Sequence, residues 1–210
     1  MPIAAALFDF GGVILSSPFD AFAGYERDHD LPDGFLRRLN ATNPDDNAWA
    51  RFERNQLDVE GFCTAFEAEA ERAGHPVDAR AVLALLAGDL RPEMVEAVRR
   101  CSQKLKTGLL TNNVVSMGAA EMATSGPHEE VLGYFDVVVE SSQVGVRKPD
   151  PRFYELACEL LSITPPEAVF LDDLGVNLKP ARALGMTTIK VNDPAAAIAE
   201  LEAVVGFPLR

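Results

Sequence analysis

Apolar and polar residues follow one another in blocks along this chain, and the blocks predict strands and helices. The first apolar block, Ala4 to Phe8, has the length of a buried strand and leads directly into Asp9. Two glycines, Gly11 and Gly12, follow shortly after. Glycine lets the backbone turn sharply, so the pattern predicts a strand that delivers Asp9 to the edge of a sheet. Ligands of open α/β sheets bind at the carboxyl ends of strands, which makes Asp9 a candidate nucleophile. An aspartate in this place is also common as a turn or helix-capping residue.

Between residues 17 and 90 the pattern is helical, and no convincing strand appears. Phe62, Phe66, Ala70 and Ala73 recur at three- and four-residue spacing and form one apolar stripe. The aromatic residues of this region are expected to form a small core of its own. Trp49 and Phe52 are also candidates for substrate contact. Capping residues and apolar spacing predict helices over 18–28, 32–40, 46–55, 59–73 and 79–87.

From residue 91 onward, helices alternate with short apolar strands, a pattern typical of a parallel sheet with right-handed crossovers. Strands are expected at 107–110, 135–139, 168–171 and 187–191. Helices are expected at 92–103, 116–124, 128–133, 150–161, 177–184 and 194–204. The chain is therefore predicted to be an α/β protein with a Rossmann-like parallel five-stranded sheet flanked by helices. Residues 1–16 and 91–210 form its core, and residues 17–90 are a helical insertion after the first strand.

Composition and net charge argue against several classes of function. The 210 residues are 48% hydrophobic and carry a formal net charge of −13, which argues against binding nucleic acid or an acidic membrane surface. Cys63, Cys101 and Cys158 lack the spacing of paired or metal-binding cysteines, so free thiols in a reducing compartment are expected. The first apolar block is too short for a membrane span and has no basic leader. We expect a cytoplasmic protein.

Polar residues follow three of the predicted strands. Asp9 ends the first, Thr111-Asn112 the second and Asp172-Asp173 the fourth, and Lys148 lies in the loop after the third. Because the carboxyl ends of parallel strands meet at one edge of the sheet, these residues are expected to share one crevice. A carboxylate nucleophile, an ammonium group, and hydroxyl and amide donors are what phosphoryl transfer requires. Paired carboxylates suit Mg²⁺, which neutralises the phosphate.

The order of these segments resembles the four motifs of the haloacid dehalogenase superfamily. The segments that carry the resemblance are 8–13, 110–112, 148–150 and 171–177. Within it, the run from residue 172 to 182 resembles the phosphatase domain at the N-terminus of soluble epoxide hydrolases and their bacterial relatives. The resemblance covers the whole chain, since the insertion at 17–90 stands where the superfamily carries a mobile helical cap.

The resemblance implies a Mg²⁺-dependent phosphatase of a small phosphorylated metabolite. It implies that Asp9 attacks phosphorus and forms an aspartyl-phosphate, and that Thr111 and the Asn112 backbone bind the transferring phosphoryl group. Lys148 then bridges the nucleophile and the phosphate and keeps Asp9 ionised. The implied metal ligands are Asp9, the Gly11 carbonyl, Asp173, and Asp172 either directly or through water, with Asn177 orienting the acidic pair.

One position departs from the family pattern. Phosphatases of the superfamily usually carry a second aspartate two residues after the nucleophile, as general acid and then base, and here that position is Gly11. General acid–base catalysis contributes about 10² to 10⁴-fold, so this loss predicts a slow enzyme or one limited to leaving groups that need no proton. His29 and His75, both in the insertion, are the candidates that could replace the acid.

Two alternatives stay open at this stage. The first is a dehalogenase-like hydrolase in which Asp9 attacks carbon, although that reaction needs no metal and the acidic pair Asp172-Asp173 argues against it. The second is a family member that binds a phosphorylated ligand or a protein partner without turnover, as the loss of the acid at Gly11 suggests. The sequence is compatible with a monomer or a homodimer.

Overall fold

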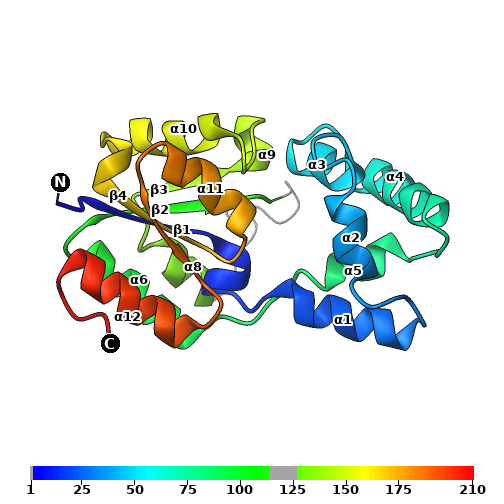
Figure 1. Ribbon diagram of the computed structural model, residues 1–210, viewed down its shortest axis with the longest axis horizontal. Helices are drawn as coiled ribbons and strands as arrows, with labels where there is room; N and C mark the ends of the chain where they lie inside the picture. The colour runs from blue at the N-terminus through cyan, green and yellow to red at the C-terminus, as the bar shows by residue number, and fades with distance from the viewer. Residues whose placement is uncertain (1, 114–126) are drawn as a thin grey trace.

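A parallel sheet of five strands forms the centre of the larger part of the protein, on the left in Figure 1. The computed structural model describes residues 2–113 and 127–210 of the chain. In spatial order the strands run β3-β2-β1-β4-β5, and every neighbouring pair is parallel. Their bounds are β1 (Ala5–Phe8), β2 (Lys106–Thr111), β3 (Val137–Glu140), β4 (Ala168–Asp172) and β5 (Thr187–Lys190). The predicted α/β fold with a five-stranded parallel sheet is confirmed.

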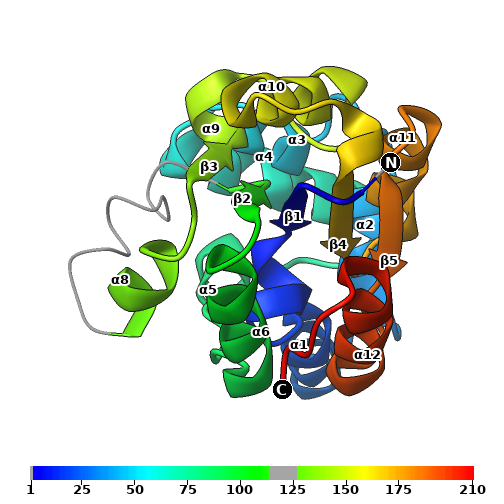
Figure 2. The same ribbon diagram turned by 90° about the vertical axis from the view of Figure 1, so that its left-hand side faces the viewer.

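Helices cover both faces of the sheet, as Figures 1 and 2 show. One face carries α6 (Pro92–Ser102), α8 (Pro127–Leu132) and α12 (Pro194–Val205), and the other carries α9 (Ser141–Val144), α10 (Pro151–Leu161) and α11 (Gly175–Ala183). Successive side chains of β1 enter opposite cores. Ala6 and Phe8 pack in the cluster with α6 and α12, whereas Ala5 and Leu7 pack in the cluster with α10. A strand buried on both faces reads as an uninterrupted apolar run, which explains the first block of the sequence.

The segment between β1 and α6 folds into helices that lie to one side of the sheet (Figure 1). These are α1 (Pro18–Asp28), α2 (Phe35–Ala41), α3 (Ala48–Glu53), α4 (Val59–Arg72) and α5 (Ala79–Ala84). Their aromatic side chains form a separate hydrophobic cluster. In it the Phe62 ring stacks on the Phe52 ring, with 4.5 Å between the ring centroids, and packs edge-on against Trp49, with 4.8 Å between the centroids. The two connections to the sheet lie side by side, because Ser16 N donates to the Asp89 carbonyl at 2.8 Å.

Differences from the predicted elements concern their ends and the shortest pieces. Helix α1 has the predicted bounds, whereas α11 begins at Gly175, two residues earlier than predicted. The four-residue α9 and the 3₁₀ turn at Pro165–Glu167 were not predicted, because such short pieces leave no periodic signal. The helix predicted at 116–124 lies outside the described residues. Within the part of the chain that the structure describes, no helix is both long and apolar enough to cross a membrane.

Candidate active site

Asp9 directly follows β1 at the carboxyl edge of the sheet. Its backbone N donates to the Leu171 carbonyl on β4 at 2.9 Å, so pairing within the sheet fixes the position of the Asp9 backbone. The Asp9 side chain is 11% exposed, and its Oδ1 accepts from the Phe10 backbone N at 2.7 Å. The same oxygen lies 2.8 Å from Lys148 Nζ. These contacts hold the Asp9 carboxylate in one orientation at the edge of the sheet.

The two glycines after Asp9 differ in what they do. Gly12 has φ +76°, and a Cβ placed there would lie 2.3 Å from Asp173 Oδ2, so this position requires glycine. Gly11 has φ −66° and ψ 132°, which any L-residue adopts, and a Cβ there would meet no atom within 4 Å. The fold therefore leaves open space at residue 11, the position at which the resemblance expects an acid.

Asp172 ends β4 and is fully buried. Its Oδ1 accepts from Leu174 N at 2.8 Å, and its Oδ2 lies 2.8 Å from Lys148 Nζ. Asn177 on α11 donates from Nδ2 to both oxygens at 3.1 and 3.0 Å, and the Tyr154 hydroxyl in turn donates to the Asn177 carbonyl at 2.6 Å. The orienting contact that the sequence assigned to Asn177 is present for Asp172. Because both of its oxygens accept hydrogen bonds, Asp172 fixes the position of the Lys148 ammonium group next to α11.

Lys148 joins the two strand ends. Its side chain is 1% exposed, and its Nζ bridges Asp9 and Asp172 at 2.8 Å to each. The Asn112 side chain holds the Lys148 backbone through two hydrogen bonds, one donated by Asn112 Nδ2 to the carbonyl at 3.0 Å and one accepted by Asn112 Oδ1 from the backbone N at 2.9 Å. Sequence reasoning assigned only the backbone of Asn112 and missed this role of its side chain. Thr111 is the last residue of β2, so it reaches the same edge of the sheet.

Negative charge exceeds positive charge at this edge. Asp9, Asp172 and Asp173 each offer a carboxylate oxygen within 4.8 Å of the others, whereas Lys148 supplies one ammonium group. Burial raises the pKa of Asp9 well above its usual value, and the Asp172 carboxylate adds to this while Lys148 opposes it. Burial and the Asp172 charge raise the pKa of Asp173 to about 6. Although burial disfavours the charged form of Lys148, attraction to Asp172 and Asp9 raises its pKa overall, so it stays protonated.

These three carboxylates fit a divalent cation. Mg²⁺ prefers hard oxygen ligands and is commonly held by one or two carboxylates together with a substrate phosphate. Asp173 is suited to direct contact because its oxygen faces the turn at Gly12, whereas both Asp172 oxygens already accept hydrogen bonds. Burial is the main cause of the raised pKa of Asp9 and Asp173, and a cation at this place would offset both burial and the neighbouring negative charge by favouring the ionised carboxylates.

Arg91 is a site-supporting residue that sequence reasoning missed. It stands where the chain returns from the insertion, and its Nη1 donates to the Gly12 carbonyl at 2.6 Å, while its backbone N donates to the Ile14 carbonyl at 2.9 Å. The guanidinium thus anchors the glycine turn that follows Asp9. Nothing in the local sequence signals this contact, since the partners are about 80 positions apart.

The histidines and aromatic residues of the insertion make contacts within the insertion. His29 stacks on the Tyr25 ring, with its Nδ1 2.9 Å from the Tyr25 carbonyl, and His75 meets the edge of the Phe35 ring at 5.1 Å. Trp49 and Phe52 are buried in the hydrophobic cluster of the insertion, as expected from their pattern. These contacts favour packing roles for all four side chains.

Comparison with known proteins places these motifs in a family context. A family model described as "Hydrolase: haloacid dehalogenase-like hydrolase" matches residues 3–185. The mouse acyl-CoA dehydrogenase family member 10 is 38% identical over an alignment of 212 positions, which covers 98% of this chain and 19% of that protein. The pig bifunctional epoxide hydrolase 2 is 33% identical over an alignment of 221 positions, which covers 100% of this chain and 40% of that protein. The chain thus spans less than half of the length of these two relatives.

Two further proteins match over nearly their whole length. The sesquiterpene phosphatase astK of Aspergillus oryzae is 25% identical over an alignment of 205 positions, which covers 96% of each chain. A crystal structure of the putative HAD-hydrolase YfnB from Bacillus subtilis, bound to magnesium, superposes with a TM-score of 0.67 at 16% identity and covers 99% of this chain and 100% of that one. At this identity the second likeness concerns the fold alone.

Proposed function

The chain belongs to the haloacid dehalogenase-like hydrolases, and from this premise we propose that it is a Mg²⁺-dependent phosphatase of a small phosphorylated metabolite. The observation that carries the proposal is the convergence of Asp9, Lys148 and the pair Asp172-Asp173 at one edge of the sheet. A relative of matching length that is named as a phosphatase supports the same reaction.

In this proposal Asp9 is the nucleophile. Its Oδ1 is held by Lys148 and by the Phe10 backbone N, which leaves Oδ2 to attack phosphorus. The new O–P bond forms as the bond to the ester oxygen breaks, and the leaving group departs as its oxyanion, which takes a proton from water to become the alcohol. A water molecule then attacks the phosphorus of the aspartyl-phosphate, releasing inorganic phosphate and regenerating the carboxylate. Thr111 and the Asn112 backbone bind the phosphoryl oxygens.

The metal ligands in the proposal are Asp9, the Gly11 carbonyl and Asp173. Asp172 supports them by accepting hydrogen bonds from Lys148, Asn177 and Leu174. When bound, Mg²⁺ neutralises the phosphoryl oxygens and so lowers the barrier to attack by an anionic nucleophile. Lys148 supplies a second, fixed positive charge, because its Nζ is tied to both Asp9 and Asp172.

Gly11 sets the leaving-group preference. With no carboxyl group at this position, the alcohol must leave without a proton from residue 11. Aryl phosphates tolerate this, because a phenolate is a stable leaving group, whereas alkyl and sugar phosphates need a proton from another source. The proposal therefore predicts faster turnover of aryl than of alkyl esters.

The test is phosphate release from an aryl, an alkyl and a sugar phosphate, each with Mg²⁺ and with chelator. Turnover is expected with Mg²⁺, with loss of activity in chelator and in Asp9→Asn. Asp28→Asn is the matched control, since it removes an exposed carboxylate at the end of α1. Activity that survives both Asp9→Asn and chelator would overturn the proposal. Metal-independent halide release from a 2-haloacid would point instead to carbon attack by Asp9.

A further inference from the structure

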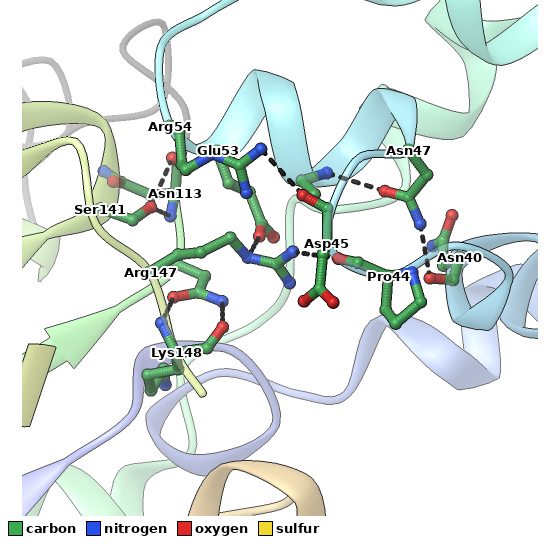
Figure 3. Close-up of polar contacts among 12 residues, drawn as sticks. Asn40, Pro44, Asp45, Asn47, Glu53, Arg54, Asn113, Ser141, Arg147 and Lys148 are labelled. Atoms are coloured by element: carbon green, nitrogen blue, oxygen red, sulfur yellow. Dashed lines mark hydrogen bonds and ion pairs between the residues drawn. The ribbon is translucent and has the colours of Figure 1, made fainter. Parts of the chain in front are cut away.

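An ion pair between Arg147 and Glu53 joins the insertion to the core (Figure 3). It lies apart from the two chain connections at Ser16 and Asp89. Arg147, in the loop after α9, places its Nε 2.7 Å from Glu53 Oε2 at the end of α3. The Arg147 Nη1 also donates to the Pro44 carbonyl at 3.0 Å. The guanidinium thus holds both the segment that leads into α3 and the last residue of that helix.

This pair is better shielded than ordinary surface pairs of the protein. The side chains of Arg147 and Glu53 are 20% and 16% exposed, whereas those of Arg152 and Glu159 on α10 are 52% and 57% exposed. Exposed pairs contribute little because water and salt screen them. Loss of one partner from a shielded pair leaves the other charge without compensation in a poorly hydrated place.

The core side of the contact is held by several hydrogen bonds and adjoins the candidate active site. Arg147 directly precedes Lys148, whose backbone is held by the Asn112 side chain. Asn113, which follows Asn112, donates from its backbone N to Ser141 Oγ at 3.0 Å. Its carbonyl accepts a hydrogen bond from Ser141 Oγ at 3.1 Å. Arg147 therefore extends from a loop that hydrogen bonds tie to the end of β2, and its partners Glu53 and Pro44 lie in the insertion.

We propose that Arg147 is a positioning residue that holds the insertion closed over the reaction centre by binding Glu53 and the Pro44 carbonyl. It acts through the insertion and does not touch the phosphoryl group. Closure excludes water from the site and brings the surface of α3 over the bound substrate. This role in turnover rests on the proposed phosphatase function, but the closure itself does not.

Closure is tested by resonance energy transfer between dyes on the insertion and the core. Glu71→Cys on α4 and Glu200→Cys on α12 provide exposed labelling sites on the two parts. The native cysteines are buried and remain unlabelled: Cys63, Cys101 and Cys158. Transfer is measured in the full chain with Mg²⁺, with and without inorganic phosphate.

Four substitutions are compared in the labelled protein. Arg147→Met keeps most of the apolar stem but removes the charge, and Glu53→Gln removes the partner charge with little change of shape. Both are expected to lower the closed population, and Arg147→Lys is expected to restore part of it. Arg54→Met is the matched control, because Arg54 bonds only inside the insertion in the contacts described for it, to the Asp45 carbonyl and Gln56.

Kinetics with an aryl phosphate separate positioning from chemistry. If substrate binding must first close an open insertion, Arg147→Met and Glu53→Gln raise KM by about 10-fold and change kcat by less than about threefold. Arg54→Met leaves both constants within about twofold.

The outcomes distinguish the two proposals. Unchanged energy transfer in Arg147→Met and Glu53→Gln would overturn the closure, whatever the activity. Lowered transfer with an unchanged KM would overturn the role in turnover. If the wild-type protein releases no phosphate from any ester, the proposed function fails, and the transfer measurements still decide whether Arg147 closes the insertion.

Discussion

Replacing Asp173 by asparagine is expected to stabilise the metal-free protein. Burial and the neighbouring Asp172 charge raise the pKa of Asp173 from 3.8 to about 6. The folded protein therefore disfavours the Asp173 carboxylate relative to the unfolded chain. A shift of this size corresponds to about 3 kcal/mol at neutral pH, which asparagine relieves because it has nearly the same shape and no charge.

The sign of the pH dependence follows from the same shift. Between pH 4 and pH 6 the folded protein binds more protons at Asp173 than the unfolded chain, so stability falls as pH rises through this window. Above pH 6 the full difference of about 3 kcal/mol separates the variant from the wild type. Below the unfolded pKa both forms are protonated, and the difference disappears.

The measurement is urea unfolding in chelator at pH 4 and pH 8. Asp172→Asn is the matched comparison, because its carboxylate accepts from Lys148, Asn177 and Leu174. Loss of that charge leaves Lys148 with one partner fewer in a buried place and is expected to cost about 3 to 5 kcal/mol.

Two results would refute this reasoning. One is an Asp173→Asn variant that is no more stable than the wild type at pH 8, and the other is a difference that persists at pH 4. Addition of Mg²⁺ should then stabilise the wild type but not Asp173→Asn, since a ligand stabilises only the state that binds it.

Three further changes test the glycine turn and the insertion. Gly11→Asp is expected to raise alkyl phosphate turnover about 10²-fold or more, and Gly11→Asn, as control, to leave it unchanged; equal rates in the two variants would contradict the assignment of the missing acid. Gly12→Ala should abolish Mg²⁺-dependent phosphate release, because its Cβ would collide with Asp173 Oδ2; calorimetric Mg²⁺ binding equal to wild type would disprove this. Phe62→Ala should lower the unfolding free energy by about 3 to 5 kcal/mol, as urea unfolding can check, whereas a loss below about 1 kcal/mol would mean that the insertion core repacks.

The sequence by itself determined the fold class and the order of the candidate site segments. A strand buried on both faces must be apolar throughout, and a short connection must break the pattern with glycine or a capping residue, so β1 and α1 were both predicted. Parallel strands end at one edge, so the sequence alone predicts that Asp9 and the pair Asp172-Asp173 lie close together.

Element ends and contacts between distant residues needed the tertiary structure. The pairing of the Asn112 side chain with Lys148, the bond from Arg91 to Gly12, and the ion pair of Glu53 with Arg147 each join residues far apart in the chain. Local periodicity carries no information on such pairs.

The two glycines show the same division at adjacent positions. Both read as turn residues in the sequence, yet Gly12 is required by its positive φ and by Asp173, whereas Gly11 stands in open space with an ordinary backbone. The difference depends on what the folded chain brings within van der Waals reach of each Cα. Sequence patterns record the conformational needs of one segment, and only the packed structure decides which distant atoms that segment meets.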